Sequence, residues 1–216
     1  MPRNGEGGEG DQSAAFVEAA ASLDDAGVET ILDDAFASGS FERVVERRLM
    51  PALRALGEAW ANGVVSVAAE HAASHAVLRR LSAAFEAAGR LDVESPVLVG
   101  LPPGSRHELG VLAFATAARR RGIGVVYLGA DVPEQSWRDA AQVTRARAVV
   151  IGIPTPADRG AAEGVAHAMT EARGLLVAVG GPGAPDAQLP GAVIRLPDDI
   201  PNAATALEQA LADRRD

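Results

Sequence analysis

Residues 96–121 decide the fold, and they read PVLVGLPPGSRHELGVLAFATAARRR. An unbroken apolar run opens the stretch, a loop rich in glycine and proline follows, and an alanine-rich helical pattern begins at His107. The same succession of apolar run, loop and helical run continues toward the C-terminus. Continuous apolar strands separated by helices are typical of a parallel sheet that is buried on both faces.

We expect five strands, at 96–101, 124–128, 148–153, 175–179 and 192–195. The helices are expected at 107–121, 133–144, 158–172, 183–188 and 202–213. This alternation predicts a doubly wound, flavodoxin- or Rossmann-like α/β domain with a five-stranded parallel sheet in the order 2-1-3-4-5. Ligands of such sheets bind beyond the carboxyl ends of the strands, so one site is expected among the loops at 101–107, 129–132, 152–158 and 180–185.

The first part of the chain predicts helices instead of strands. Apolar residues recur there about every 3.6 residues and indicate four helices, at 13–23, 28–38, 41–61 and 66–88. Pro51 falls within the third helix and is expected to kink it. The predicted organisation is therefore a disordered tail over 1–11, a four-helix bundle over 12–90 and an α/β domain over 91–216.

The composition excludes several classes of function. The formal net charge is −9, and no stretch is basic enough to follow a phosphate backbone, so direct nucleic acid binding is disfavoured. No apolar run is long enough to span a membrane, and the N-terminus has no apolar signal region. The absence of cysteine excludes disulfides, thiolate nucleophiles and thioether-linked tetrapyrroles, and a cytoplasmic location is expected.

The expected site loops carry one histidine and several small residues. His107 follows the first strand, where a neutral imidazole can donate a lone pair to a metal above the sheet edge. The alternative is a partly exposed histidine at the start of a helix. Gly152 and the pair Gly180-Gly181 follow two further strands and allow a bulky group to approach the backbone, although ordinary turns use the same residues. Neither a dinucleotide fingerprint nor a Walker lysine is present, which disfavours phosphate loops.

A second cluster lies in the helical part, where Trp60 is followed by Glu70 and His71. Taken alone, Trp60 suits a core position. Glu70 and His71 are adjacent and point in directions about 100° apart, so they cannot both be core residues. His71 and His75 have a spacing that can bind metal, but the HExxH arrangement is missing and a structural zinc site is disfavoured.

Together these residues resemble the cobalamin-binding module, from about residue 41 to the C-terminus. That family has Asp/Glu-x-His-x-x-Gly, then Ser-x-Leu/Thr, then Gly-Gly, after its first, third and fourth strands. The resemblance implies that His107 is the lower axial ligand of cobalt and that the cobalamin tail lies in the α/β domain. The further cofactor-binding residues that it implies are Ser105, Arg106, Leu109, Gly110, Gly152, Thr155, Gly180 and Gly181.

The helical part resembles the cap of cobalamin-dependent light sensors, known best from MerR-type photoreceptor repressors. In that family a tryptophan, a glutamate and a histidine surround the adenosyl group, and Trp60, Glu70 and His71 match them. The resemblance implies adenosylcobalamin or another alkyl or aquo form, cleavage of the cobalt–carbon bond by light, movement of the cap, and a dimer or tetramer. A photocobilin-like variant with a bilin such as biliverdin would hold it non-covalently, because no cysteine is present.

Three departures from the family pattern bear on function. Ser105 replaces the acid that holds the second nitrogen of the ligating imidazole, so His107 is expected to be a weaker donor. Gly152 replaces a serine in the tail pocket, and Thr155 is the nearest hydroxyl that can substitute for it. The DNA-binding region is missing from this sequence, so we expect output through a partner protein.

The leading hypothesis is a non-enzymatic, light-sensing regulatory protein that binds cobalamin. The alternative from another class is the corrinoid subunit of a methyltransferase system, which carries a methyl group on cobalt between two enzymes. A third interpretation is a cobalamin pocket that has lost its cofactor, given the changes at Ser105 and Gly152. Whether His71 or His75 becomes a second cobalt ligand after illumination is left open.

Overall fold

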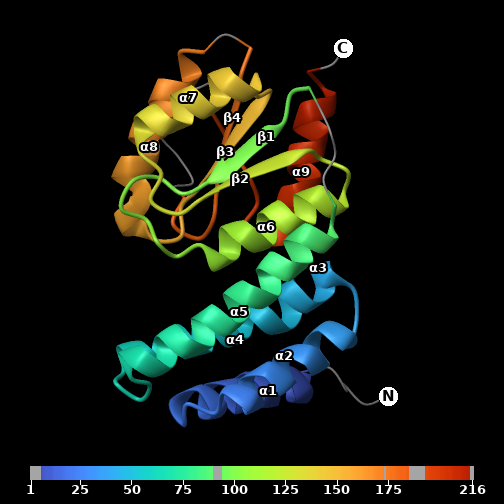
Figure 1. The fold of residues 1–216 in the computed structure, drawn as a ribbon, viewed down its shortest axis with the longest axis vertical. Helices are drawn as coiled ribbons and strands as arrows, with labels where there is room; N and C mark the ends of the chain where they lie inside the picture. The colour runs from blue at the N-terminus through green and yellow to red at the C-terminus, as the bar shows by residue number, and fades with distance from the viewer. Residues whose placement is uncertain (1–5, 90–93, 173, 185–192, 215–216) are drawn as a thin grey trace. The chain divides into compact units, whose positions relative to one another are not determined.

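The computed structural model describes residues 6–89, 94–172, 174–184 and 193–214 (Figure 1). The chain divides into two compact units, Met1–Ala83 and Ala84–Asp216, and the division falls within one long helix, α5. The first unit is helical and the second contains the sheet. Among the described residues, no helix combines the length and the apolar character that crossing a membrane requires.

The first unit consists of consecutive helices, some of which start at a side-chain cap. Asp24 accepts a hydrogen bond from the Gly27 amide, and Ser66 accepts one from the Ala69 amide, which satisfies amides that a helix leaves free at its first turn. The helices are α1 (Glu6–Ala21), α2 (Asp25–Ala37), α3 (Phe41–Val44), η1 (Val45–Leu49), α4 (Met50–Ala61) and α5 (Val67–Ala87).

The N-terminal end of this unit differs from the expectation of a disordered tail over 1–11. Residues 6–11 belong to α1, while residues 1–5 lie outside the described residues. The stretch EGGEG at the start of α1 contains weak helix formers, and propensity alone would not extend a helix through it. The expectation therefore failed where sequence propensity was its only support.

The expected disturbance at Pro51 takes the form of a π-helical turn. Residues 41–61 are helical throughout, but η1 interrupts the α-helical hydrogen bonding directly before Pro51. The Met50 amide donates to the Val45 carbonyl, one residue further back than in an α-helix. A wider turn suits this place because proline has no amide hydrogen and its ring crowds the carbonyl four residues earlier.

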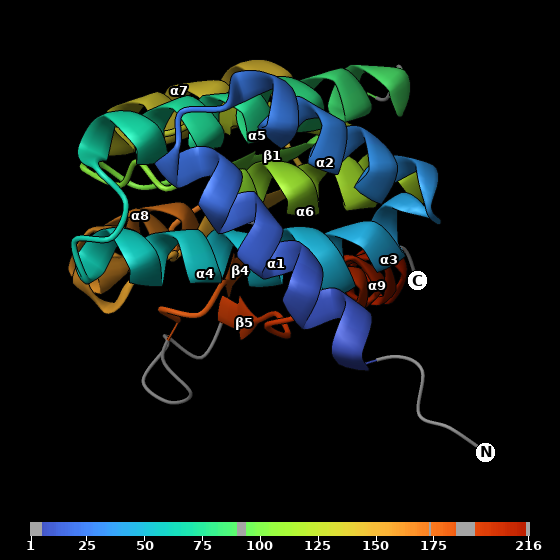
Figure 2. The same ribbon diagram turned by 90° about the horizontal axis from the view of Figure 1, so that it is seen from below.

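Apolar side chains and two arginines hold the helices of the first unit together. Helix α1 packs against α2 and α4 (Figure 2). Phe16, Leu32 and Leu49, which belong to three different helices, line one apolar space. Glu29 of α2 accepts a hydrogen bond of 2.7 Å from Arg79 of α5, and Arg80 pairs with Asp33 of α2. The expected helical character of this part is confirmed.

The second unit is built on an all-parallel sheet with the order β2-β1-β3-β4-β5, as predicted. The register aligns Leu98, Val149 and Val177 across three neighbouring strands, so their side chains share one face. The strands are β1 (Val97–Gly100), β2 (Val125–Gly129), β3 (Ala148–Gly152), β4 (Leu176–Gly180) and β5 (Val193–Arg195).

Helices cover both faces of this sheet. Helix α6 packs against α9 on one face, and α7 packs against α8 on the other (Figure 1). The helix expected at 183–188 is not found over its described part, because residues 183–184 form a turn; residues 185–188 lie outside the described residues. The helices are α6 (Leu109–Arg120), α7 (Glu134–Thr144), η2 (Pro156–Asp158), α8 (Arg159–Thr170) and α9 (Ile200–Ala212).

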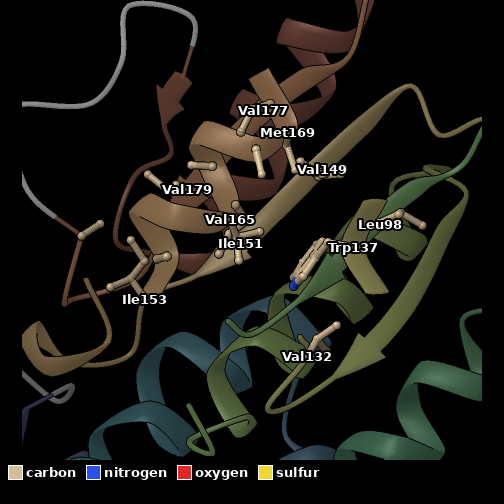
Figure 3. Packing of buried hydrophobic residues seen from close by; sticks show 14 residues of the cluster. Leu98, Val132, Trp137, Val149, Ile151, Ile153, Val165, Met169, Val177 and Val179 are labelled. Atoms are coloured by element: carbon tan, nitrogen blue, oxygen red, sulfur yellow. The ribbon is translucent and has the colours of Figure 1, made fainter. Parts of the chain in front are cut away.

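Trp137 anchors α7 to the sheet. Its side chain is completely buried in a cluster with Leu98, Ile151 and Val165, drawn in Figure 3. The ring also fills the space beside Gly100, where a β-carbon would stand 3.3 Å from Trp137 Cζ2. The end of β1, from which the His107 loop departs, is therefore packed under this tryptophan.

We expect Trp137→Ala to lower the free energy of unfolding by about 3–5 kcal/mol, because it leaves a large cavity in the core. Val143→Ala is the matched control, since Val143 lies on the same helix with 83% of its side chain exposed. Urea unfolding followed by circular dichroism measures both. A Trp137→Ala protein that is as stable as the control would contradict this account of the core.

Candidate functional site

His107 lies at the carboxyl edge of the sheet, in the loop that joins β1 to α6. Its imidazole is exposed, and the residue precedes the first helical residue, Leu109, instead of opening the helix as expected. The strand before it, β1, pairs with both β2 and β3, and the strand order of the sheet reverses at this place. Ligands of doubly wound sheets bind at this switch point, so the imidazole is free to bind one.

The residues that precede His107 in its loop are held by the loop that follows β2. The Asp131 carboxylate accepts a hydrogen bond of 2.7 Å from the Gly104 amide, and the Asp131 amide donates to the Ser105 carbonyl at 2.9 Å. Gly104 has a φ of +81°, which a glycine adopts without strain. Backbone and side chain of Asp131 thus contact both residues of this turn.

Glu108, the residue after His107, is held by a side chain of β2. The Tyr127 hydroxyl donates to the Glu108 carboxylate at 2.8 Å. Burial, reinforced by the neighbouring Glu108 carboxylate, raises the pKa of Tyr127 far above its usual range, so the phenol keeps its proton and remains a donor. Glu108 is also the N-cap residue of α6.

Ser105 is buried, although it carries a hydroxyl. Its side chain is 1% exposed, and its Oγ has no hydrogen-bond partner among the described residues. A buried hydroxyl without a partner costs about 1–3 kcal/mol. This hydroxyl lies two residues from His107 and lacks a partner, so the residue types at Ser105 and His107 fit a metal-bound cofactor.

The glycines of the neighbouring loops serve close packing. A β-carbon at Gly181 would stand 2.8 Å from the Ile153 carbonyl oxygen, and the residue has a φ of +110°. At Gly152 the nearest atom would be Leu101 Cδ2, at 2.7 Å, so a group placed there needs the Leu101 side chain to move. At Gly180 the nearest atom is Leu196 Cβ, at 3.4 Å.

The remaining expected residues of the α/β unit surround the same edge. Arg106 is exposed, with its guanidinium 3.9 Å from the Asp131 carboxylate, and Leu109 and Gly110 are half-buried in the first turn of α6. The Thr155 hydroxyl donates to the Asp158 carboxylate at 2.7 Å, so its proton is already committed. The role of each toward a cofactor remains a prediction.

The cluster of Trp60, Glu70 and His71 in the helical unit is too exposed to belong to the core. Trp60 is 49% exposed and lies near the turn between α4 and α5, where Val64 and Val67 are also exposed. On α5, Glu70 accepts a hydrogen bond of 2.6 Å from Ser74, and its other oxygen lies 3.7 Å from His71 Nε2. The interpretation of Trp60 as a core residue is therefore wrong.

His71 and His75 lie near each other on α5, with ring centroids 6.5 Å apart. No third metal-ligating side chain joins them: the part of the chain that the structure describes holds no group of three or more His, Cys, Asp or Glu side chains suited to a metal.

Sequence reasoning missed Asp131 and Tyr127. Both lie on or just after β2, whose loop was expected at the site although no residue of it was singled out. An acid directly after the strand, in the sequence GADVP at 129–133, was the available signal for Asp131. No comparable signal in the sequence pointed to Tyr127. Its hydrogen bond to Glu108 depends on which face of the edge strand β2 is turned toward the loop after β1.

Two models of the B12 binding domain match this chain, one over residues 12–84 and the other over residues 96–205. The HTH-type transcriptional repressor CarH of Myxococcus xanthus is 33% identical over 159 residues, which cover 71% of this chain and 52% of that protein. The HTH-type transcriptional repressor CarA of the same organism is 30% identical over 126 residues, covering 58% and 42%. The match spans about half the length of these curated relatives or less.

Among solved structures, the monomethylamine corrinoid protein of Methanosarcina barkeri resembles this chain with a TM-score of 0.73. The alignment covers 90% of this chain and 96% of that protein, at 14% sequence identity. At this identity the similarity establishes a shared fold.

We expect Gly181→Ala to lower the free energy of unfolding by about 1–3 kcal/mol, because a β-carbon meets backbone at a φ that other residues rarely adopt. Gly160→Ala is the control, since a β-carbon at Gly160 has open space around it. Thermal unfolding of both variants measures the difference. Equal stability of the two would show that the close approach of the two loops is not needed.

Proposed function

The chain belongs to the B12-binding domain family, and from this premise we propose that it is a cobalamin-dependent light-sensing regulator in which His107 is the lower axial ligand. The observation that carries the proposal is an exposed imidazole at the switch point of the sheet, two residues along the chain from a buried hydroxyl without a partner. The cofactor supplies a cobalt centre with a light-sensitive bond to carbon. The residues of the chain bind and orient it.

His107 would hold the cofactor through a ring nitrogen, since imidazole nitrogen is a good ligand for cobalt. Ser105 hydrogen-bonds the other ring nitrogen in place of an acid and brings no charge, so the imidazole donates less electron density than a carboxylate-paired histidine. Gly152, Thr155, Gly180 and Gly181 line the space for the tail of the cofactor once Leu101 moves aside. Arg106, Leu109 and Gly110 complete the contacts around His107.

Trp60, Glu70 and His71 contact the group on the upper face. A half-exposed indole next to exposed valines is a surface that apolar contact stabilises, which supports a ligand there. The partly buried Glu70 carboxylate, held by Ser74, is suited to accept hydrogen bonds from a ribose hydroxyl. Without a bound group these three residues would lose their contacts, and the position of the helical unit or the oligomeric state would change.

We propose a cytoplasmic protein that has no catalytic activity of its own and signals to a partner protein. The net charge of −9 opposes direct contact with nucleic acid. A bilin such as biliverdin bound non-covalently beside cobalamin is a variant of this proposal. The second candidate is a corrinoid methyl carrier, because the chain shares its fold with a corrinoid protein of that kind.

The direct test is reconstitution with adenosylcobalamin in the dark, followed by absorbance and size measurements before and after green light. We expect a cobalamin spectrum, a change in it on illumination and a change in size. A methylcobalamin complex that transfers its methyl group to a partner enzyme would favour the carrier instead. Additional red absorbance after expression with biliverdin would reveal a bilin.

His107→Ala is expected to change the absorbance of the bound cobalamin, because the lower ligand is lost. His167→Ala is the control, since His167 is an exposed histidine on α8. A His107→Ala spectrum identical to that of the control would refute the ligand assignment.

Trp60→Ala is expected to weaken adenosylcobalamin about tenfold more than methylcobalamin, because only the larger group reaches the indole. Leu23→Ala is the control, since Leu23 is a similarly exposed apolar residue of the same unit. Equilibrium binding in the dark measures the ratio of affinities. Equal losses for both cobalamins would exclude a contact between Trp60 and the adenosyl group.

A further inference from the structure

We propose that the edge strand β2 and the loop after it position His107. Asp131 holds the residues that precede His107 in the chain, and Tyr127 holds the residue that follows it. The inference rests on the proposed function, because it concerns the residue that binds cobalt. Asp131 and Tyr127 are positioning residues, since each contacts the loop and neither contacts the reacting atoms.

Asp131 fixes the part of the loop before His107. One carboxylate oxygen accepts the Gly104 amide at 2.7 Å, and the Asp131 amide donates to the Ser105 carbonyl at 2.9 Å. Asp131 has a φ of +54°, a conformation that residues other than glycine rarely adopt and that aspartate tolerates better than most. The left-handed backbone lets the amide and the side chain of one residue reach the same turn.

Tyr127 fixes the part of the loop after His107. Its hydroxyl donates to Glu108 at 2.8 Å, and the Glu108 amide donates to the Arg106 carbonyl at 3.0 Å. The latter bond closes a tight turn with His107 at its centre. The Glu108 carbonyl then accepts the Leu112 amide at 2.9 Å, which connects this turn to α6.

Tyr127 is itself held by the last turn of α5. Its ring lies edge-on to Phe85 with centroids 5.8 Å apart, and the Arg119 guanidinium lies 3.4 Å from the centroid of the Phe85 ring. Arg119 is 8% exposed and donates to the carbonyls of Phe85 and Val125. Tyr127 therefore cannot turn away from Glu108 without losing its contact with the Phe85 ring, against which Arg119 also packs.

This arrangement matters because Ser105 offers the imidazole no charge. Without a carboxylate partner, the orientation of His107 depends on the backbone of its loop. A ligand that must be ordered on binding loses affinity through side-chain and backbone entropy, and a displacement of about 1 Å is enough to weaken a site. Contacts on both sides of His107 reduce that loss.

The test compares Asp131→Ala and Tyr127→Phe with the control Asp139→Ala, an exposed acid on α7. Tyr127→Phe keeps the ring against Phe85 and removes only the hydroxyl. Hydrogen exchange of residues 101–109 in the cofactor-free protein should rise about tenfold in Asp131→Ala. In the aquocobalamin complex, the cyanide concentration that displaces His107 from cobalt should fall about tenfold in both variants.

Asp131→Asn keeps an oxygen that accepts from Gly104 and should behave like the wild type in both measurements. If Asp131→Ala fails to fold, Asp131→Asn and Tyr127→Phe still test the inference. Unchanged hydrogen exchange and unchanged cyanide displacement in Asp131→Ala and Tyr127→Phe, with His107→Ala still altering the spectrum, would overturn the positioning role alone. A wild-type protein that shows no His107-dependent cobalamin spectrum would overturn the proposed function and this inference with it.

Discussion

The central constraint is that β1 lies between β2 and β3 in a parallel sheet. Backbone hydrogen bonds on both edges of β1 fix the point where the His107 loop leaves the sheet. The chain continues from β1 into α6 and from β3 into α8, which lie on opposite faces of the sheet, so the loops that follow these two strands diverge at the switch point. The exposed imidazole, the packed glycines and the contacts of Asp131 all depend on that geometry.

The regular elements of the second unit could be predicted from sequence because their signals are strong and local. Unbroken apolar runs marked all five strands, and their alternation with helices was sufficient for the strand order. The helix expected at 183–188 is not found at residues 183–184, where the glycine- and proline-rich run Gly180–Gly183 favours a turn. The helical residues 6–11 were not predicted, because the glycine and acidic residues there indicated a disordered tail.

The residues of the site were predictable to a different extent. His107 and the glycines follow strands at motif spacing, and the motif placed them at one sheet edge. The burial of Ser105 without a partner, the exposure of Trp60 and the contacts of Asp131 and Tyr127 depend on packing between segments distant in sequence. Pattern reasoning does not resolve such contacts, because their energies depend on geometry that composition and periodicity do not contain.

The proposed coordination of cobalt by His107 is tested most directly by electron paramagnetic resonance of the cobalt(II) cobalamin complex with protein labelled with ¹⁵N in its histidines. The account predicts that the three-line nitrogen splitting of each cobalt line becomes a two-line splitting in the labelled wild type, because the axial nitrogen belongs to the protein. The His107→Ala protein should not show this change. A three-line splitting that persists in the labelled wild type would contradict the account, since the axial nitrogen would then come from the cofactor itself.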